Sequence, residues 1–112
     1  MTEDRQRRLA LNEALAREVN EVVDGLAAGW FDPEEPIEFR CECVDVGCEE
    51  RVPLTRDEYL GVRSNRYWFI VVPGHEALEV ERVVRRAREF VVVEKLGAGR
   101  DVADETAGRR SH

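Results

Sequence analysis

Aliphatic residues recur near the start of the chain at steps of four, four, three and four, at positions Leu11, Leu15, Val19, Val22 and Leu26. This spacing places one apolar stripe along a helix, and we predict a helix from residue 5 to about residue 28. Two prolines, at positions 33 and 36, end the pattern. We expect the stripe to pack on the protein's own sheet. A coiled-coil seam is the alternative, although the stripe covers barely two heptads.

The next segment alternates between apolar and polar positions, as a strand with one buried face does. Its odd-numbered residues from Ile37 to Cys43 are apolar or cysteine and the residues between them are charged, so we predict a strand over 37–43. A short antiparallel return strand follows over residues 50–54. Pro53 within it has no amide hydrogen to donate to a neighbouring strand, and this predicts a position at the sheet edge.

Two further helices flank an apolar strand. Thr55, with Glu58 three residues later, has the spacing of a capping box and predicts a short helix over 55–65. Residues 66–72 are mostly apolar without alternation, which is typical of a central strand buried on both faces. A helix over 76–89 is predicted from apolar residues at the spacing i, i+3, i+4 and i+7, namely Val80, Val83, Val84 and Ala87.

Together these elements predict a single α+β domain over residues 5–96, built on a four-stranded mixed sheet. Residues 66–95 are expected to form a β-α-β unit with a right-handed parallel crossover. Because such a crossover returns the last strand in the direction of the first, Lys95 is expected at the end of the sheet that His75 reaches. Residues 97–112 have little apolar surface to bury and are predicted to be a flexible C-terminal tail.

Composition narrows the class of protein. The 112 residues are enough for one domain, and a hydrophobic content of 43% supplies a core. No apolar signal region follows the N-terminal MTEDRQRR, and the longest apolar run, residues 67–72, is too short to span a bilayer. We therefore expect a cytoplasmic protein, in which clustered cysteines act as metal ligands or reactive thiols. The net charge of −7 disfavours nucleic acid as the partner.

All three cysteines lie within eight residues, as Cys41, Cys43 and Cys48 in the pattern CxCx4C. The two-residue period of a strand points the first two thiols to one side, and the turn around Gly47 can return the third. A fourth ligand is supplied by His75, at a Pro-Gly turn beyond an apolar strand. Three thiolates and one imidazole suit tetrahedral zinc, so the sequence predicts a closed, structural Cys3His zinc site at one end of the sheet.

Two other interpretations of the cysteines and His75 remain open. The three thiols can form a redox sensor. However, positions 31–50 contain eight acidic residues and only one basic residue, Arg40, and this excess of negative charge raises the pKa of a free thiol. The second interpretation is a zinc hydrolase in which Glu76 is the general base. Four protein ligands leave no position for water, and the chain has no HExxH motif, so a non-catalytic protein is favoured.

The segment RVVRRAR concentrates basic side chains on the predicted helix 76–89, opposite its valines. These are Arg82, Arg85, Arg86 and Arg88. A solvated helix face, with Glu81 one turn before Arg85, is the simpler interpretation. The alternative is a docking surface for an acidic protein partner or for nucleic acid. We expect a protein partner of unknown identity, and a monomer or weak dimer.

Five motifs together resemble a family of short bacterial proteins that are frequent in high-GC, actinobacterial-type genomes. They are LNEALAREVNE (11–21), CECVDVGC (41–48), LTRDEY (54–59), VPGHE (72–76) and VVVEKLG (91–97), and the resemblance covers most of residues 7–97. The resemblance implies a Cys3His metal site at the same four residues, and it carries no established activity. The predicted function is therefore a zinc-stabilised, non-catalytic interaction or regulatory module.

Overall fold

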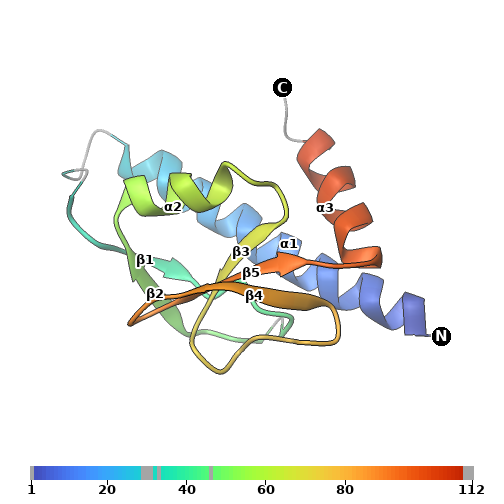
Figure 1. Ribbon diagram of the computed structural model, residues 1–112. Helices are drawn as coiled ribbons and strands as arrows, with labels where there is room; N and C mark the ends of the chain where they lie inside the picture. Colours follow the sequence, from blue (N-terminus) through green and yellow to red (C-terminus); the bar gives the residue numbers. More distant parts are fainter. Residues whose placement is uncertain (1, 29–31, 33, 46, 110–112) are drawn as a thin grey trace.

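The computed structural model describes residues 2–28, 32, 34–45 and 47–109, which contain three helices and five short strands (Figure 1). In chain order the elements are α1 (Thr2–Ala27), β1 (Ile37–Arg40), β2 (Arg51–Leu54), α2 (Arg56–Arg63), β3 (Trp68–Val71), β4 (Glu81–Arg86), β5 (Val91–Lys95) and α3 (Ala98–Arg109). The class is α+β, as predicted, but the sheet differs from the prediction.

The strands form two antiparallel sheets, so the predicted four-stranded mixed sheet is wrong. β1 and β2 form a hairpin in which Ile37 lies opposite Leu54, and Pro53 therefore lies in an edge strand as expected. The second sheet has the order β3-β5-β4, so β5 is its central strand and β3 is not. β5 runs antiparallel to β3, so Val91 lies opposite Val71, at the end of the sheet that leads to His75. Lys95 lies at the other end of the sheet, and its predicted position near His75 is wrong. The predicted parallel crossover does not form.

The predicted helix over 76–89 is wrong, because this segment contains strand β4 and the turn that leads into β5. The backbone amide of Ala87 donates to the carbonyl of Phe90 and closes a tight turn between the two strands. A register shift between Val83 and Arg85 interrupts the alternation of β4, so Val83 and Val84 are both half-buried. A bulge of this kind imitates helical spacing in the sequence.

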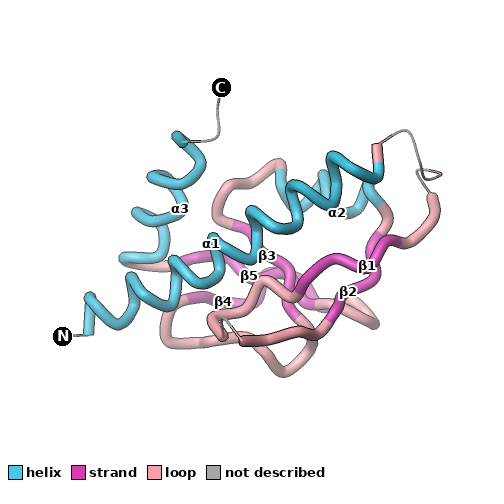
Figure 2. The backbone as a smooth tube through the Cα atoms, turned by 180° about the vertical axis from the view of Figure 1, so that it is seen from behind, coloured by secondary structure: helices cyan, strands magenta, loops and turns pink. Residues whose placement is uncertain are grey.

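Helix α1 crosses one side of the sheets (Figure 2). The prediction that its aliphatic stripe packs on the sheet is wrong. The aliphatic stripe is exposed: Leu15 is 52% and Leu26 is 69% accessible to solvent. The buried face carries small and polar residues, among them Ala10, Ala14, Glu13, Arg17 and Asn20. The sequence pattern identified the helix correctly and its inward face incorrectly.

The buried polar side chains of α1 form hydrogen bonds with backbone carbonyls of other segments. Arg17 donates to the carbonyl of Arg66 at 2.8 Å and to that of Trp68, and its guanidinium stacks on the Phe69 ring at 3.8 Å. Asn20 donates to the carbonyl of Arg40 at 2.8 Å. Buried polar groups are tolerated where they are hydrogen-bonded, and these contacts fix the rotation of the helix.

A second set of buried polar side chains, three in number, lies between α1 and the three-stranded sheet. Lys95 at the end of β5 contacts Glu13 of α1 and lies 2.8 Å from the Glu81 carboxylate of β4. All three side chains are at most 1% exposed. Burial raises the pKa of Glu81 to about 7 and lowers that of Lys95.

The remaining helices close the domain. α2 begins with the predicted capping box, in which Thr55 accepts from the amide of Glu58 and the Glu58 carboxylate accepts from the amide of Thr55. Residues 98–109, placed by composition in a flexible tail, form α3, which packs on α1 through buried Val102 (Figure 1). None of the described helices is both long enough and apolar enough to cross a membrane.

Candidate metal centre

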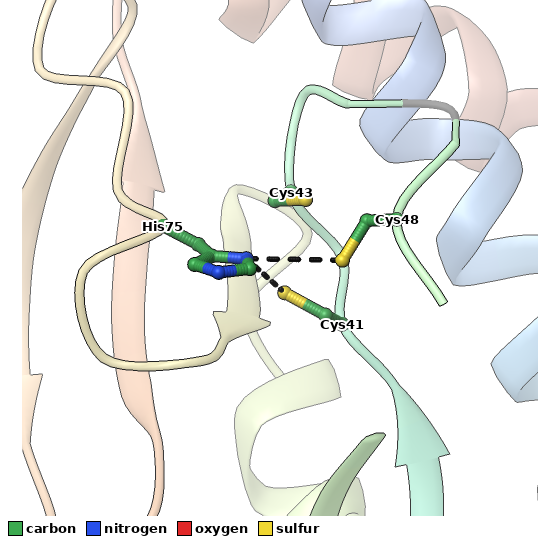
Figure 3. A group of neighbouring side chains, drawn as sticks. All are labelled: Cys41, Cys43, Cys48 and His75. Carbon is green, nitrogen blue, oxygen red and sulfur yellow. Dashed lines mark hydrogen bonds between the residues drawn. The ribbon is translucent and has the colours of Figure 1, made fainter. Parts of the chain in front are cut away.

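The end of strand β1 positions two of the cysteines. The amide of Cys41 donates to the carbonyl of Glu50 at 3.1 Å and extends the β1–β2 hairpin by one step. The next amide, of Glu42, donates to the carbonyl of Ile70 at 2.7 Å and joins this segment to β3. The buried Glu42 side chain accepts from the Ile70 amide and the Tyr59 hydroxyl. Cys41 and Cys43 gather on one side of this extended segment (Figure 3).

A tight turn returns the third cysteine to the first two. The Asp45 carboxylate accepts from the amide of Gly47 at 2.9 Å, and the Asp45 carbonyl accepts from the amide of Cys48 at 3.0 Å. An aspartate that accepts from a backbone amide two residues ahead is a common turn device. This turn brings the Cys48 thiol beside the thiol of Cys41 (Figure 3).

The histidine comes from the turn that follows β3. The amide of His75 donates to the carbonyl of Val72 at 2.9 Å, and Gly74 has a φ of 96°. A positive φ of this size is strained for any residue with a Cβ atom, so the turn depends on glycine. The imidazole of His75 then reaches across to the cysteines that follow β1 (Figure 3).

The four predicted ligands lie together, as the sequence indicated. The ligand atoms all lie within 4.8 Å of one another; they are the sulfurs of Cys41, Cys43 and Cys48 and a ring nitrogen of His75. Nδ1 of His75 is 3.6 Å from the sulfur of Cys41 and 3.7 Å from that of Cys48. Tetrahedral zinc with ordinary bond lengths separates a sulfur and a nitrogen ligand by about 3.6 Å, and two sulfur ligands by about 3.8 Å. The two sulfur–nitrogen separations match those of tetrahedral zinc, and the four ligand atoms lie close enough together that they could hold a metal ion.

Glu50 contacts the imidazole of His75 on the side away from the cysteine sulfurs. Its carboxylate lies 2.9 Å from Nε2 of His75, on the side of the ring opposite Nδ1. A carboxylate at one ring nitrogen fixes the tautomer and leaves the other nitrogen free to bind metal. Glu50 was not predicted from the sequence. Its signal was an acidic side chain two positions after Cys48, which is hard to recognise in a segment with many acidic residues.

The three thiols of the site interact with one another. The hydrogen bond between Cys41 and Cys43 raises the pKa of Cys41 and lowers that of Cys43 to about 5, and burial raises the pKa of Cys48. The amide of Val72 also donates to the sulfur of Cys41 at 3.2 Å. The thiolate form of Cys43 is therefore favoured over that of Cys41, and a metal cation would stabilise all three thiolates.

The other predicted functional residues lie outside the ligand cluster. Glu76, the candidate general base, accepts from the amide of Gly74 at 2.7 Å and from Arg86 at 3.2 Å. Arg82 and Arg85 lie with Arg86 on β4, and Arg88 lies in the following turn; Arg82 pairs with Glu94 at 2.8 Å. The arginines therefore lie on an edge strand and its turn, with Arg82 and Arg85 on one face and Arg86 on the other, and not on a helix face. His112 lies outside the described residues.

No family model, no curated protein and no solved structure matches this chain. The resemblance to short actinobacterial-type proteins therefore stays a prediction. The four side chains and the separations of their ligand atoms support a metal site.

Proposed function

We propose that this chain is a small zinc-binding protein of non-catalytic type, in which one zinc ion stabilises an interaction or regulatory module. The observation that carries the proposal is the separation of the four ligand atoms, all within 4.8 Å of one another. Zinc is favoured over other metals because three thiolates and one imidazole match its preferred donors and tetrahedral geometry.

The origin of the ligands supports a structural role for the metal. Cys41, Cys43 and Cys48 belong to the β1–β2 hairpin, whereas His75 follows β3 in the three-stranded sheet. A zinc ion bound by all four would link the two sheets near the point where Glu42 contacts Ile70. The cysteines are at most 8% exposed, whereas the His75 side chain is 29% exposed, so the sulfur side of the site is shielded from solvent and the histidine side is partly open.

The same geometry supports a non-catalytic site. A catalytic zinc keeps one position for water and has a general base nearby. Here four protein side chains can fill the tetrahedron, and Glu50 contacts the ring nitrogen of His75 that faces away from the sulfurs. Glu76 is engaged by Gly74 and Arg86. The described residues therefore supply a closed ligand set without a base directed at the metal.

Cobalt substitution tests whether the site is closed. We expect the Co²⁺-loaded protein to show the intense visible absorption of a four-coordinate thiolate site, unchanged by excess azide or thiocyanate. A closed site offers no position for a fifth ligand, whereas a catalytic site exchanges its water for a small anion. His75→Ala is the matched control, since its vacated position should take up the anion. A shift of the wild-type bands on anion addition would contradict the structural role and favour the hydrolase.

The interaction role is an expectation that rests on charge. Arg82 and Arg86 are 60% and 64% exposed; Arg82 lies with Arg85 on one face of β4, Arg86 lies on the other face, and Arg88 lies in the turn that follows. An edge strand with a basic surface suits an extended acidic segment of a protein partner, because complementary charges steer association and an edge can accept a further strand. A cytoplasmic location agrees with free thiols at the metal site.

A further inference from the structure

A cavity of about 400 Å³ lies between helix α2 and the face of the three-stranded sheet that points away from α1. The strand register identifies this face. Arg17 of α1 stacks on the Phe69 ring, so the adjacent residue, Trp68, points to the opposite side of β3. Val92 is paired with Ile70 and therefore lies on the same face as Trp68. The volume is that of a small-molecule site, and none of the described residues that line it is a candidate metal ligand.

Apolar side chains from four elements line the cavity. The Trp68 indole is held in place because its Nε1 donates to the Glu94 carboxylate at 3.2 Å. Val84 lines the cavity because the register shift in β4 leaves it without a partner on β5, and a bulge re-aims side chains in this way. Val62 of α2 and Val92 of β5 complete the apolar lining. These side chains provide a preformed surface for the apolar part of a ligand.

Charged side chains of both signs line the same cavity. Helix α2 contributes Asp57 and Glu58, and β4 contributes Arg85. The Glu58 carboxylate is already engaged, since it accepts from the amide of Thr55 at 2.8 Å. The Asp57 carboxylate forms no hydrogen bond or ion pair with a described residue, and Arg85 forms no ion pair there. One carboxylate and one guanidinium, from two different elements, are therefore available to a ligand.

We propose that this cavity binds a small zwitterion with an apolar body, the chemistry shared by a free apolar amino acid and a dipeptide. Arg85 binds the carboxylate of the ligand, because a guanidinium can donate two parallel hydrogen bonds to it. Asp57 accepts from the ammonium group, and the apolar side chain of the ligand lies against Trp68. An anion alone would leave Asp57 unmatched, and a cation alone would leave Arg85 unmatched, so the two charges together favour a zwitterion.

Isothermal titration calorimetry of the purified protein tests the ligand class. The probes are phenylalanine and the dipeptide alanyl-phenylalanine, and we expect at least one of them to bind with one molecule per chain. Acetylating the amine of the bound probe, or amidating its carboxylate, should each weaken binding by about tenfold or more, because each removes a hydrogen-bonded charge. The tighter of the two probes identifies the source of the ligand. Absence of binding for both probes at millimolar concentration, or equal binding of the blocked forms, would overturn the proposal.

Filling the cavity tests its position. Gly61 of α2 lines the cavity, and a Cβ atom added there would meet no other atom within 4 Å. Gly61→Leu should therefore keep the fold and the zinc content of the wild type and weaken binding by about tenfold or more, since the leucine occupies the space of the ligand. Gly25→Leu is the matched control: Gly25 is a helical glycine of α1 with the same open space, and it does not line the cavity.

Removing the charges tests the role of each end. Arg85→Gln should bind the amidated probe as well as the unmodified one, and Asp57→Asn should bind the acetylated probe as well as the unmodified one. A residue that acts only on the fold would weaken all forms of the probe alike. A Gly61→Leu variant that binds as the wild type does, or an Arg85→Gln variant that keeps the full preference for a free carboxylate, would overturn the proposed site.

Discussion

Replacing His75 by alanine, or Cys48 by serine, is expected to lower the free energy of unfolding of the zinc-loaded protein by about 4 kcal/mol for each thousand-fold loss of zinc affinity. The reason is linkage: zinc that binds only the folded chain adds its binding free energy to folding. The ligands join the β1–β2 hairpin to the turn after β3, so this contribution acts between the two sheets. Denaturant unfolding at a fixed free zinc concentration measures it.

A control variant and unfolding measurements in the presence of a chelator distinguish the loss of zinc binding from the loss of the side chain's other contacts. Glu49→Gln removes one exposed charge beside Cys48 and should leave stability within about 0.5 kcal/mol of the wild type. With a chelator present, wild type and His75→Ala should unfold at nearly the same denaturant concentration. Equal destabilisation of His75→Ala with and without zinc would show that the residue stabilises the fold independently of metal.

Replacing Lys95 by methionine is expected to destabilise the protein by about 3–5 kcal/mol. The substitution keeps the volume of the side chain but leaves Glu13 and Glu81 buried without their cation, and both are 0% exposed. Since burial raises the pKa of Glu81 to about 7, above its value in the unfolded chain, protonation favours the folded state. The deficit of the variant should therefore be smaller at pH 5 than at pH 8.

An exposed ion pair provides the control for Lys95. Arg5 and Glu79 lie 3.0 Å apart with side chains 57% and 44% exposed, so Arg5→Met should change the free energy of unfolding only slightly. Adding Glu13→Gln to Lys95→Met should recover part of the lost stability, because one buried charge is removed. A Lys95→Met variant as stable as Arg5→Met would contradict the buried arrangement of these three residues.

Local chemistry was the part of this structure that the sequence predicted well. The capping box at Thr55 and the edge position of Pro53 depend on residues within a few positions, and both are confirmed. The grouping of the four candidate ligands was also predictable, because three cysteines within eight residues leave few arrangements and His75 follows an apolar strand at a Pro-Gly turn.

Long-range pairing and the choice of buried face were not predictable. The spacing of the aliphatic residues in α1 shows that they share a side of the helix, but not what covers that side. Arg17 is buried because backbone carbonyls around β3 accept its hydrogen bonds, and Lys95 because two distant glutamates contact it. In β4 the register shift after Val83 broke the alternation that identifies a strand. Each error has its cause in contacts between residues far apart in the sequence.

The central claim is that Cys41, Cys43, Cys48 and His75 together bind one zinc ion, and metal analysis tests it most directly. Protein purified without added metal should contain one zinc per chain by elemental analysis, with its three thiols unreactive until a chelator is added. His75→Ala should contain much less zinc after the same purification, and Glu49→Gln should match the wild type. Wild-type protein with far less than one metal ion per chain and freely titrating thiols would contradict the zinc site and favour the redox sensor.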